Sequence, residues 1–297
     1  MRRSYSSDLA AIEAHPGEPL IEHLWSVAEL AESTAAAMPG DGPVDRETLR
    51  RLAWILGASH DLAKATPYFQ AHLRGQSVDR RLSSHALTSA MIGYLWVRDE
   101  LGARATDSLA HAFLPLAVFL TVRRHHGFLH QAYAEASPDD DDREVIDRQW
   151  AALRRPIFDE LLALVGAPWT VEGLDALLAR FWAANEPRAW RTLLRRLERA
   201  GDVRFYLTEN LLFSLLIDAD RLRTAFAGET PADERAVIGS DLLDAYRRRK
   251  GWVAGHDDVA SLREQLHAEV RATVDGLDLD DRFYSLTAPT GLGKTLT

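Results

Sequence analysis

A histidine and an aspartate stand side by side at the end of an apolar helical stretch, in the run Ala58-Ser59-His60-Asp61-Leu62-Ala63-Lys64. Adjacent helix positions differ by about 100° in direction, so this imidazole and this carboxylate can converge on one ion from two sides. Lys64 lies roughly one turn further on, on the Asp61 face, where its ammonium could neutralise a phosphate held by that ion. A single His-Asp pair is more often a helix end with a surface acid than a metal site. Whether this pair binds a metal ion therefore depends on which other potential ligands the chain contains.

Further candidate ligands occur near the ends of other apolar helical stretches: His23, His85, His125, His126 and a C-terminal aspartate. Each alone is better explained by a buried core residue or a surface polar group than by a ligand role. Together they predict a metal site. Asp218 and Asp220 are about 200° apart on a helix, so only one can face it. We choose Asp220, which shares a face with Leu216 and Ile217. The remaining histidines, His15 among them, are expected on the surface.

Composition restricts the chemistry. The chain has 297 residues, 46% of them hydrophobic, a formal charge of −9 and no cysteine. Disulfides, thiolate zinc sites and cysteine nucleophiles are excluded, so a metal must use imidazole and carboxylate. No apolar run has membrane-spanning length and no signal peptide is evident, so we expect a cytoplasmic protein without a membrane partner. The negative charge argues against coating nucleic acid by bulk electrostatics. Local basic clusters remain, at Arg80-Arg81, Arg123-Arg124, Arg195-Arg196 and 247–250.

The spacing of apolar residues predicts an all-α helical bundle. Asp45 is expected to cap a helix that reaches His60, and Ser84 to cap a helix that carries His85 in its first turn. The segment Phe205 to Leu222 is apolar nearly all round, which predicts a helix buried in the domain centre. The four aspartates 139–142 are expected in a solvated loop. No strand is expected before residue 280.

The C-terminal segment has a different pattern. A short strand predicted at Phe283–Thr287 is followed by Ala288-Pro289-Thr290-Gly291-Leu292-Gly293-Lys294-Thr295, a phosphate-binding loop in its helicase form. Gly291 and Gly293 would let the backbone approach phosphates, Lys294 would reach the terminal ones and Thr295 would hold magnesium. Two residues follow the loop, so we expect no ATPase or helicase activity from this chain. The predicted domains are 1–275 (core about 15–225, accessory helices 230–275) and the start of a helicase domain at 276–297.

The order His23, His60-Asp61, Asp220 resembles the HD phosphohydrolase superfamily. With His85, His125-His126, Lys64 and the phosphate loop added, the chain resembles more narrowly the HD nuclease–helicases of type I CRISPR interference. These effectors degrade DNA once a guide complex has opened it. The resemblance covers about residues 15–225 by motif, together with 283–295. The chain departs from the family pattern in having only the first helicase motif.

The resemblance implies an all-helical nuclease domain with two divalent metal ions. One ion would be held by His23, His60, Asp61 and Asp220, and Asp61 would bridge to a second held by His85, His125 and His126. Mixed imidazole and carboxylate ligands suit manganese, iron, cobalt or nickel better than magnesium, which remains possible. Asp61 and Lys64 would be the catalytic residues, with Lys64 offsetting charge on the phosphate. The implied substrate is single-stranded DNA, and the implied partner of the full-length protein is a crRNA-guided complex of the Cascade type. A monomer is expected.

Two other functions fit the same residues. An HD phosphohydrolase acting on a nucleotide or cyclic nucleotide would have a closed pocket with base-specific contacts, whereas an open basic groove favours a polynucleotide. In a non-catalytic recruitment module, the helical domain would dock the guide complex and the metals would be structural.

Overall fold

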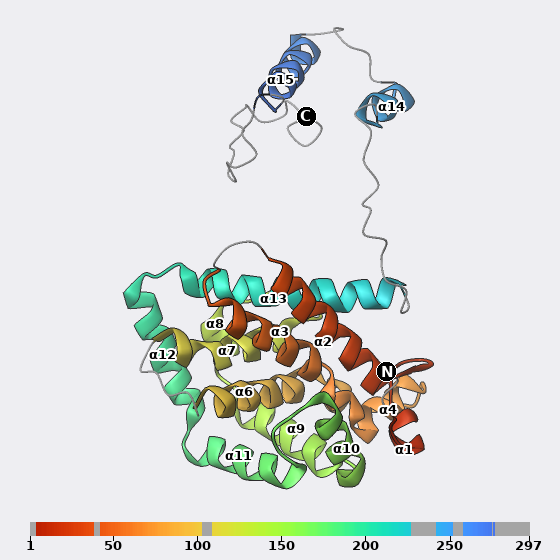
Figure 1. Ribbon diagram of the computed structural model, residues 1–297, viewed down its shortest axis with the longest axis vertical. Helices are drawn as coiled ribbons and strands as arrows, with labels where there is room; N and C mark the ends of the chain where they lie inside the picture. The colour runs from red at the N-terminus through yellow and green to blue at the C-terminus, as the bar shows by residue number, and fades with distance from the viewer. Residues whose placement is uncertain are drawn as a thin grey trace. The chain divides into compact units, whose positions relative to one another are not determined.

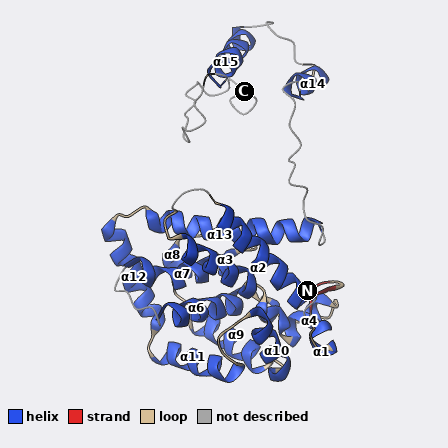
Figure 2. Cartoon of the chain, in the orientation of Figure 1, coloured by secondary structure: helices blue, strands red, loops and turns tan. Residues whose placement is uncertain are grey.

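Helices form almost every element of this computed structural model, which confirms the all-α prediction (Figures 1 and 2). The structure describes residues 4–38, 42–102, 109–226, 242–251, 258–274 and 276. The chain divides into two compact units, Met1–Pro231 and Ala232–Thr297. The second unit contains α14 (Leu242–Arg249) and α15 (Asp258–Val274). The domain boundary placed at 275/276 from the sequence stays a prediction.

The elements of the first unit are, in chain order, α1 (Ser7–Ala10), β1 (Glu13–His15), β2 (Glu18–Pro19), α2 (Leu20–Ala37), α3 (Arg46–Ser59), the 3-10 helix η1 (Leu62–Ala65), α4 (Pro67–Leu73), α5 (Arg80–Ser83), α6 (Ala86–Gly102), α7 (Leu109–Arg124), α8 (Ala132–Glu135), α9 (Asp140–Ala151), α10 (Arg155–Val165), α11 (Val171–Ala183), α12 (Glu186–Ala200) and α13 (Arg204–Phe226). Among these described helices none is long and apolar enough to cross a membrane.

The helices that matter for the site are packed in two pairs, α2 against α3 and α6 against α7, with α13 packed on α2, α3 and α7 (Figure 1). The sequence sets the start of α3, because Asp45 accepts a hydrogen bond from the backbone N–H of Thr48, as expected of an N-cap. On α2 the apolar stripe Leu20, Leu24 and Val27 is fully buried. These pairs bring the ends of several helices to one region of the core.

The α2–α3 contact depends on a glycine. Gly57 lies against the backbone of α2, and a Cβ built on it would be 2.4 Å from Cα of Ala28. No other residue could occupy this position without moving one helix. This close approach holds the last turn of α3, and the His60 that follows it, near α2.

Three expectations from the sequence were wrong. A short antiparallel hairpin, β1–β2, is present well before residue 280. The four aspartates do not form a loop: Asp139 caps α9 through a hydrogen bond from Asp142 N–H, and the other three occupy the first turn. Carboxylates are stabilised at this end of a helix by its dipole, which explains why an acidic run can be ordered.

The third correction concerns α13. Tyr206 and Leu207 on this helix are 65% and 48% exposed, and Asp218 is also exposed. Because α13 packs by one side only, it covers the bundle rather than crossing its centre. Composition alone did not reveal which face remains in solvent.

Candidate metal centre

The local path of the chain after α3 places the His-Asp pair. His60 continues the helical hydrogen bonding through its N–H to the Leu56 carbonyl, but Asp61 leaves the helix with φ −117° and ψ 8°, and η1 begins at the next residue. The two residues are therefore not on one continuous α-helix, as the sequence suggested. Both are buried, with exposures of 0% and 1%.

One group of side chains gathers around the Oδ2 atom of Asp61. Nε2 of His23, from α2, lies 3.3 Å from this oxygen, and Nε2 of His60 lies at the same distance. The two imidazole nitrogens are 3.3 Å from each other. Asp220, from α13, places Oδ1 3.4 Å from His23 Nε2 and 3.8 Å from His60 Nε2. We call these four residues the first group.

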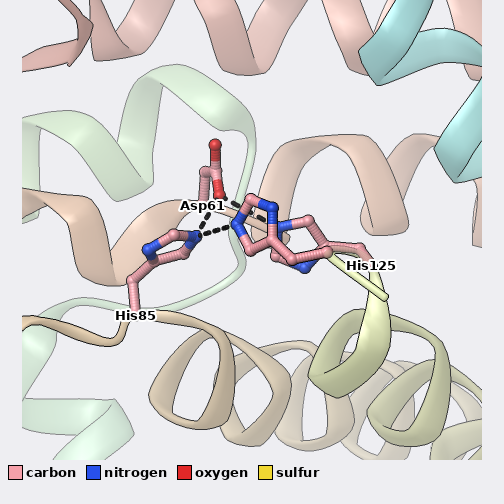
Figure 3. A group of neighbouring side chains, drawn as sticks. Asp61, His85 and His125 are labelled. Carbon is pink, nitrogen blue, oxygen red and sulfur yellow. Dashed lines mark hydrogen bonds and ion pairs between the residues drawn. The ribbon is translucent and has the colours of Figure 1, made fainter. Parts of the chain in front are cut away.

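A second group gathers around the other oxygen of the same carboxylate (Figure 3). Oδ1 of Asp61 lies 2.8 Å from Nε2 of His85 and 3.4 Å from Nε2 of His125. His126 brings its Nε2 within 2.9 Å of His85 Nε2. His85 directly precedes α6 and the two consecutive histidines follow α7, so the packing of α6 on α7 brings them together. The structure thus brings all seven predicted ligands into two groups that share Asp61.

The hydrogen bonds made by the Nδ1 atoms of His60 and His125 indicate what kind of species their Nε2 atoms can bind. Nδ1 of His60 is 2.8 Å from the Gly57 carbonyl, and Nδ1 of His125 is 2.7 Å from the Val122 carbonyl. Because a carbonyl oxygen only accepts, each Nδ1 carries the proton and each Nε2 presents a lone pair. Those lone pairs face carboxylate oxygens, and both Asp61 Oδ1 and His125 Nε2 are buried without a hydrogen-bond partner. Acceptors that converge in this way fit a cation.

The charges differ between the two groups: nearby carboxylates outweigh burial and raise the pKa values of His23 and His60, whereas burial lowers those of His85 and His126. Burial alone would raise the pKa of Asp61, but His60, His85 and Lys64 hold it well below its usual value. His126 is exposed as a residue, but its Nε2 faces His85, and partial desolvation of the ring together with the neighbouring His125 and His85 lowers its pKa to about 3, so the ring stays neutral near pH 7. Burial alone would lower the pKa of His23. The carboxylates of Asp220, Asp61 and Glu18 outweigh this effect and raise the pKa to about 10. A proton therefore competes with a metal ion at His23.

Lys64 lies on the first group's side of the shared aspartate. Its Nζ is 2.7 Å from Asp61 Oδ2 and donates to the Ala14 carbonyl at 3.3 Å, and the side chain is 3% exposed. The sequence placed this lysine one helical turn from Asp61; the 3-10 turn of η1 brings the two into direct contact.

Two residues of the hairpin were missed in the sequence. Oε2 of Glu18 lies 3.5 Å from Nδ1 of His23, and its other oxygen is 3.1 Å from Arg223 Nη2. A carboxylate behind a ligating imidazole fixes the orientation of the ring. His15 is not a free surface residue, because its half-buried ring packs edge-on against His23 with centroids 5.2 Å apart. The residues 15–17 predict a turn, but nothing in their pattern indicates that the turn folds back onto His23.

The predicted nucleotide-binding residues Gly291, Gly293, Lys294 and Thr295 lie outside the described residues, as does the strand predicted before them.

A comparison with protein families supports the same interpretation. A family model described as Cas3, HD domain, matches residues 11–196, whereas comparisons with curated proteins and with solved structures gave no match. The matched range contains every predicted ligand except Asp220, whose placement rests on the geometry described above. The HD domain of Cas3 is a metal-dependent hydrolase of CRISPR systems, and the His/Asp groups found here could hold metal ions. The resemblance deduced from the motifs is thereby confirmed, and the chain belongs to the Cas3 HD domain family.

Proposed function

We propose that this chain is a two-metal endonuclease that cleaves single-stranded DNA in CRISPR-guided antiviral defence. Membership of the family supplies the reaction class, which is metal-dependent hydrolysis. The number of ions, the substrate and the partners are our inference from the site and from the family relationship.

The observation that carries the proposal is the position of Asp61 between the two groups. Its Oδ2 faces His23 and His60, and its Oδ1 faces His85 and His125. A carboxylate that offers one oxygen to each of two histidine groups can bridge two cations. Bridged pairs of this kind, with the ions about 3.5–4 Å apart, are typical of enzymes that displace an oxygen at phosphorus.

The ligands favour a transition metal. Imidazole nitrogens supply two of the four ligands of the first group and three of the four of the second, which suits manganese, iron, cobalt or nickel, with magnesium less well matched. When bound, the ions would polarise the phosphodiester and lower the pKa of a water molecule at the site. Glu18 would hold the His23 ring in position, as the backbone carbonyls do for His60 and His125.

The exposure of the ligands indicates the direction from which substrate arrives. His126 is exposed and the Asp220 side chain is 19% exposed, whereas His23, His60 and Asp61 are buried. A phosphodiester would therefore approach across His126 and Asp220. Lys64 approaches from the buried side, so its ammonium would stabilise negative charge without blocking that entrance.

We further propose that a crRNA-guided complex of the Cascade type delivers the DNA to the full-length protein. This partner rests on the family relationship. The cytoplasmic location, the monomeric state and the lack of ATPase activity expected from the sequence stay predictions.

A cleavage assay across metals and substrates tests the proposal. Metal-depleted protein is supplied separately with manganese, iron, cobalt, nickel or magnesium, and is offered circular single-stranded DNA, duplex DNA, single-stranded RNA or a cyclic nucleotide. We expect the circle to be opened with a transition metal, because an endonuclease needs no strand end, and the Asp61→Asn variant to be inactive. Hydrolysis of the cyclic nucleotide without cleavage of the circle would instead support a nucleotide phosphohydrolase. No hydrolysis with any metal would support a recruitment module.

A further inference from the structure

An arginine-lined pocket is formed in part by residues that are next in sequence to members of the second group. It has a volume of about 390 Å³ and its polar lining comes from Arg80, Arg81, Ser84, Arg123, Arg124 and Asp142. Ser84 directly precedes His85, and Arg124 directly precedes His125. A residue of the pocket is therefore followed directly by a candidate metal ligand at two places, before the start of α6 and at the end of α7.

The buried side of this pocket holds the guanidinium groups of Arg123 and Arg124 beside two carboxylates. Glu135, which is 4% exposed, pairs with Arg123 at 2.9 Å and also with Arg124. Arg123 makes a second ion pair with Asp142 at 3.2 Å. Nη1 of Arg123 and Nε of Arg124 are still left without a hydrogen-bond partner. Glu135 thus fixes two guanidinium groups in place without using all of their donors.

The outer side of the pocket adds two arginine side chains, Arg80 and Arg81, that have weak ion pairs or none with the described residues. Arg81 meets Asp141 at 3.4 Å, but both side chains are more than half exposed, and such a pair contributes little. Arg80 is exposed, and its guanidinium makes no ion pair or hydrogen bond with the part of the chain that the structure describes. The four arginines are matched by three carboxylates, those of Glu135, Asp141 and Asp142. Among the described ion pairs, Arg80 is therefore the one pocket arginine left without a carboxylate partner, on a chain whose formal charge is −9.

We propose that this pocket binds a backbone phosphate of the DNA strand next to the phosphate that is cleaved. The inference rests on the proposed function and names a second contact point for the same substrate. A phosphodiester carries one negative charge and accepts from planar guanidinium groups in pairs, which is what Arg80 and Arg81 offer. Phe128, four residues beyond Arg124, is 83% exposed. Exposed aromatics beside arginines are typical of proteins that bind single strands, because bases stack on the ring.

The first test measures binding without cleavage. The full chain is kept metal-free with a chelator, and its affinity for a fluorescent single-stranded oligodeoxynucleotide is measured by anisotropy over a series of salt concentrations. Arg80→Gln with Arg81→Gln should weaken binding about tenfold, because charged hydrogen bonds to phosphate are lost. The slope of log K against log salt should fall by about 0.7, the value for one neutralised phosphate of a single strand. The guanidinium of Arg80 has no partner among the described residues, and the exposed pair of Arg81 with Asp141 contributes little, so the two substitutions should leave the packing almost unchanged.

A matched control removes two charges elsewhere. Arg180 on α11 and Arg188 on α12 are exposed and do not line the pocket. Arg180→Gln with Arg188→Gln lowers the net charge by the same amount, so it should change affinity less than about twofold if the effect is local. An equal loss of affinity in both double variants would overturn the pocket assignment and indicate general electrostatics.

A second measurement separates this inference from the proposed function. With manganese added, Arg80→Gln with Arg81→Gln should raise KM for the oligonucleotide and leave kcat unchanged. Hydrolysis of bis(p-nitrophenyl) phosphate, a diester with no neighbouring phosphate, should be unaffected. If wild type cleaves DNA and the variant binds and cleaves it equally well, the pocket proposal is wrong and the nuclease proposal stands. If the wild-type protein hydrolyses only the small diester, the proposal of a DNA substrate and the proposal of a phosphate-binding pocket are both wrong.

Discussion

Gly57→Ala is the substitution that most directly links helix packing to the metal centre. A Cβ at this position would lie 2.4 Å from Cα and 2.5 Å from N of Ala28, and 2.8 Å from the carbonyl carbon of Val27. All three are backbone atoms of α2, so no side-chain rotation relieves the contact. The methyl group can be accommodated only if α2 and α3 move apart.

The size of that movement follows from ordinary contact distances. Carbon atoms in van der Waals contact lie at 3.4–4 Å, so the helices must separate by about 1 Å. His23 is carried by α2, and His60 follows Gly57 by three residues at the end of α3. Metal–ligand distances tolerate only about 0.2 Å. We expect overpacking to cost about 1–3 kcal/mol, which lowers Tm by roughly 5 °C, and metal affinity to fall by about 10- to 100-fold.

Thermal unfolding of metal-free protein and calorimetric titration with manganese measure the two effects separately. Leu174→Ala is the control, because Leu174 is 1% exposed in α11, which contributes no predicted ligand. Its cavity should destabilise the protein by about 2–5 kcal/mol and leave metal affinity unchanged. If Gly57→Ala kept wild-type metal affinity while losing stability, the coupling between the α2–α3 distance and the site would be refuted.

Asp61→Ala is expected to abolish metal-dependent DNA cleavage, because no other described carboxylate joins the two histidine groups; wild-type cleavage by purified variant with a native circular dichroism spectrum would contradict this. Lys64→Ala should lower turnover more than bound metal, since its proposed partner is phosphate, and equal losses in turnover and metal content would show that it acts on Asp61 instead. Asp220→Asn should weaken metal binding and stop cleavage, whereas the exposed Asp218→Asn should keep most activity; exchanged phenotypes would reverse the assignment. Burial raises the pKa of Glu209 from 4.5 to about 7. The proton that it holds therefore favours the folded state fully below pH 4.5, and this contribution is lost as pH rises through 7. Glu209→Gln should match wild type in Tm near pH 4 and be more stable at pH 8 by up to about 3 kcal/mol, and a pH-independent difference would refute the assignment.

Several properties of this protein are already determined by local sequence. The apolar spacing and the Asp45 cap are sufficient for the all-α prediction and for the position of α3, because helix formation depends on residues within a few positions of one another. The chemical types of the ligands are also a property of the sequence: without cysteine, a metal site must use imidazole and carboxylate. The order of His23, His60-Asp61 and Asp220 indicated the HD superfamily, and His85, His125-His126, Lys64 and the phosphate loop indicated the narrower family.

Tertiary structure decided how those ligands are shared and supported. That one oxygen of Asp61 faces His23 and the other faces His85 depends on the packing of α2 on α3 and of α6 on α7, which no local pattern encodes. The lone pairs of His60 and His125 are directed by backbone carbonyls, a feature visible only when the rings are placed. Glu18 reaches His23 because a hairpin folds back on α2, and the arginine pocket forms because residues from α5, α7 and α9 meet. Such contacts join segments far apart in the chain, so their geometry is set by how the helices pack rather than by the residues alone.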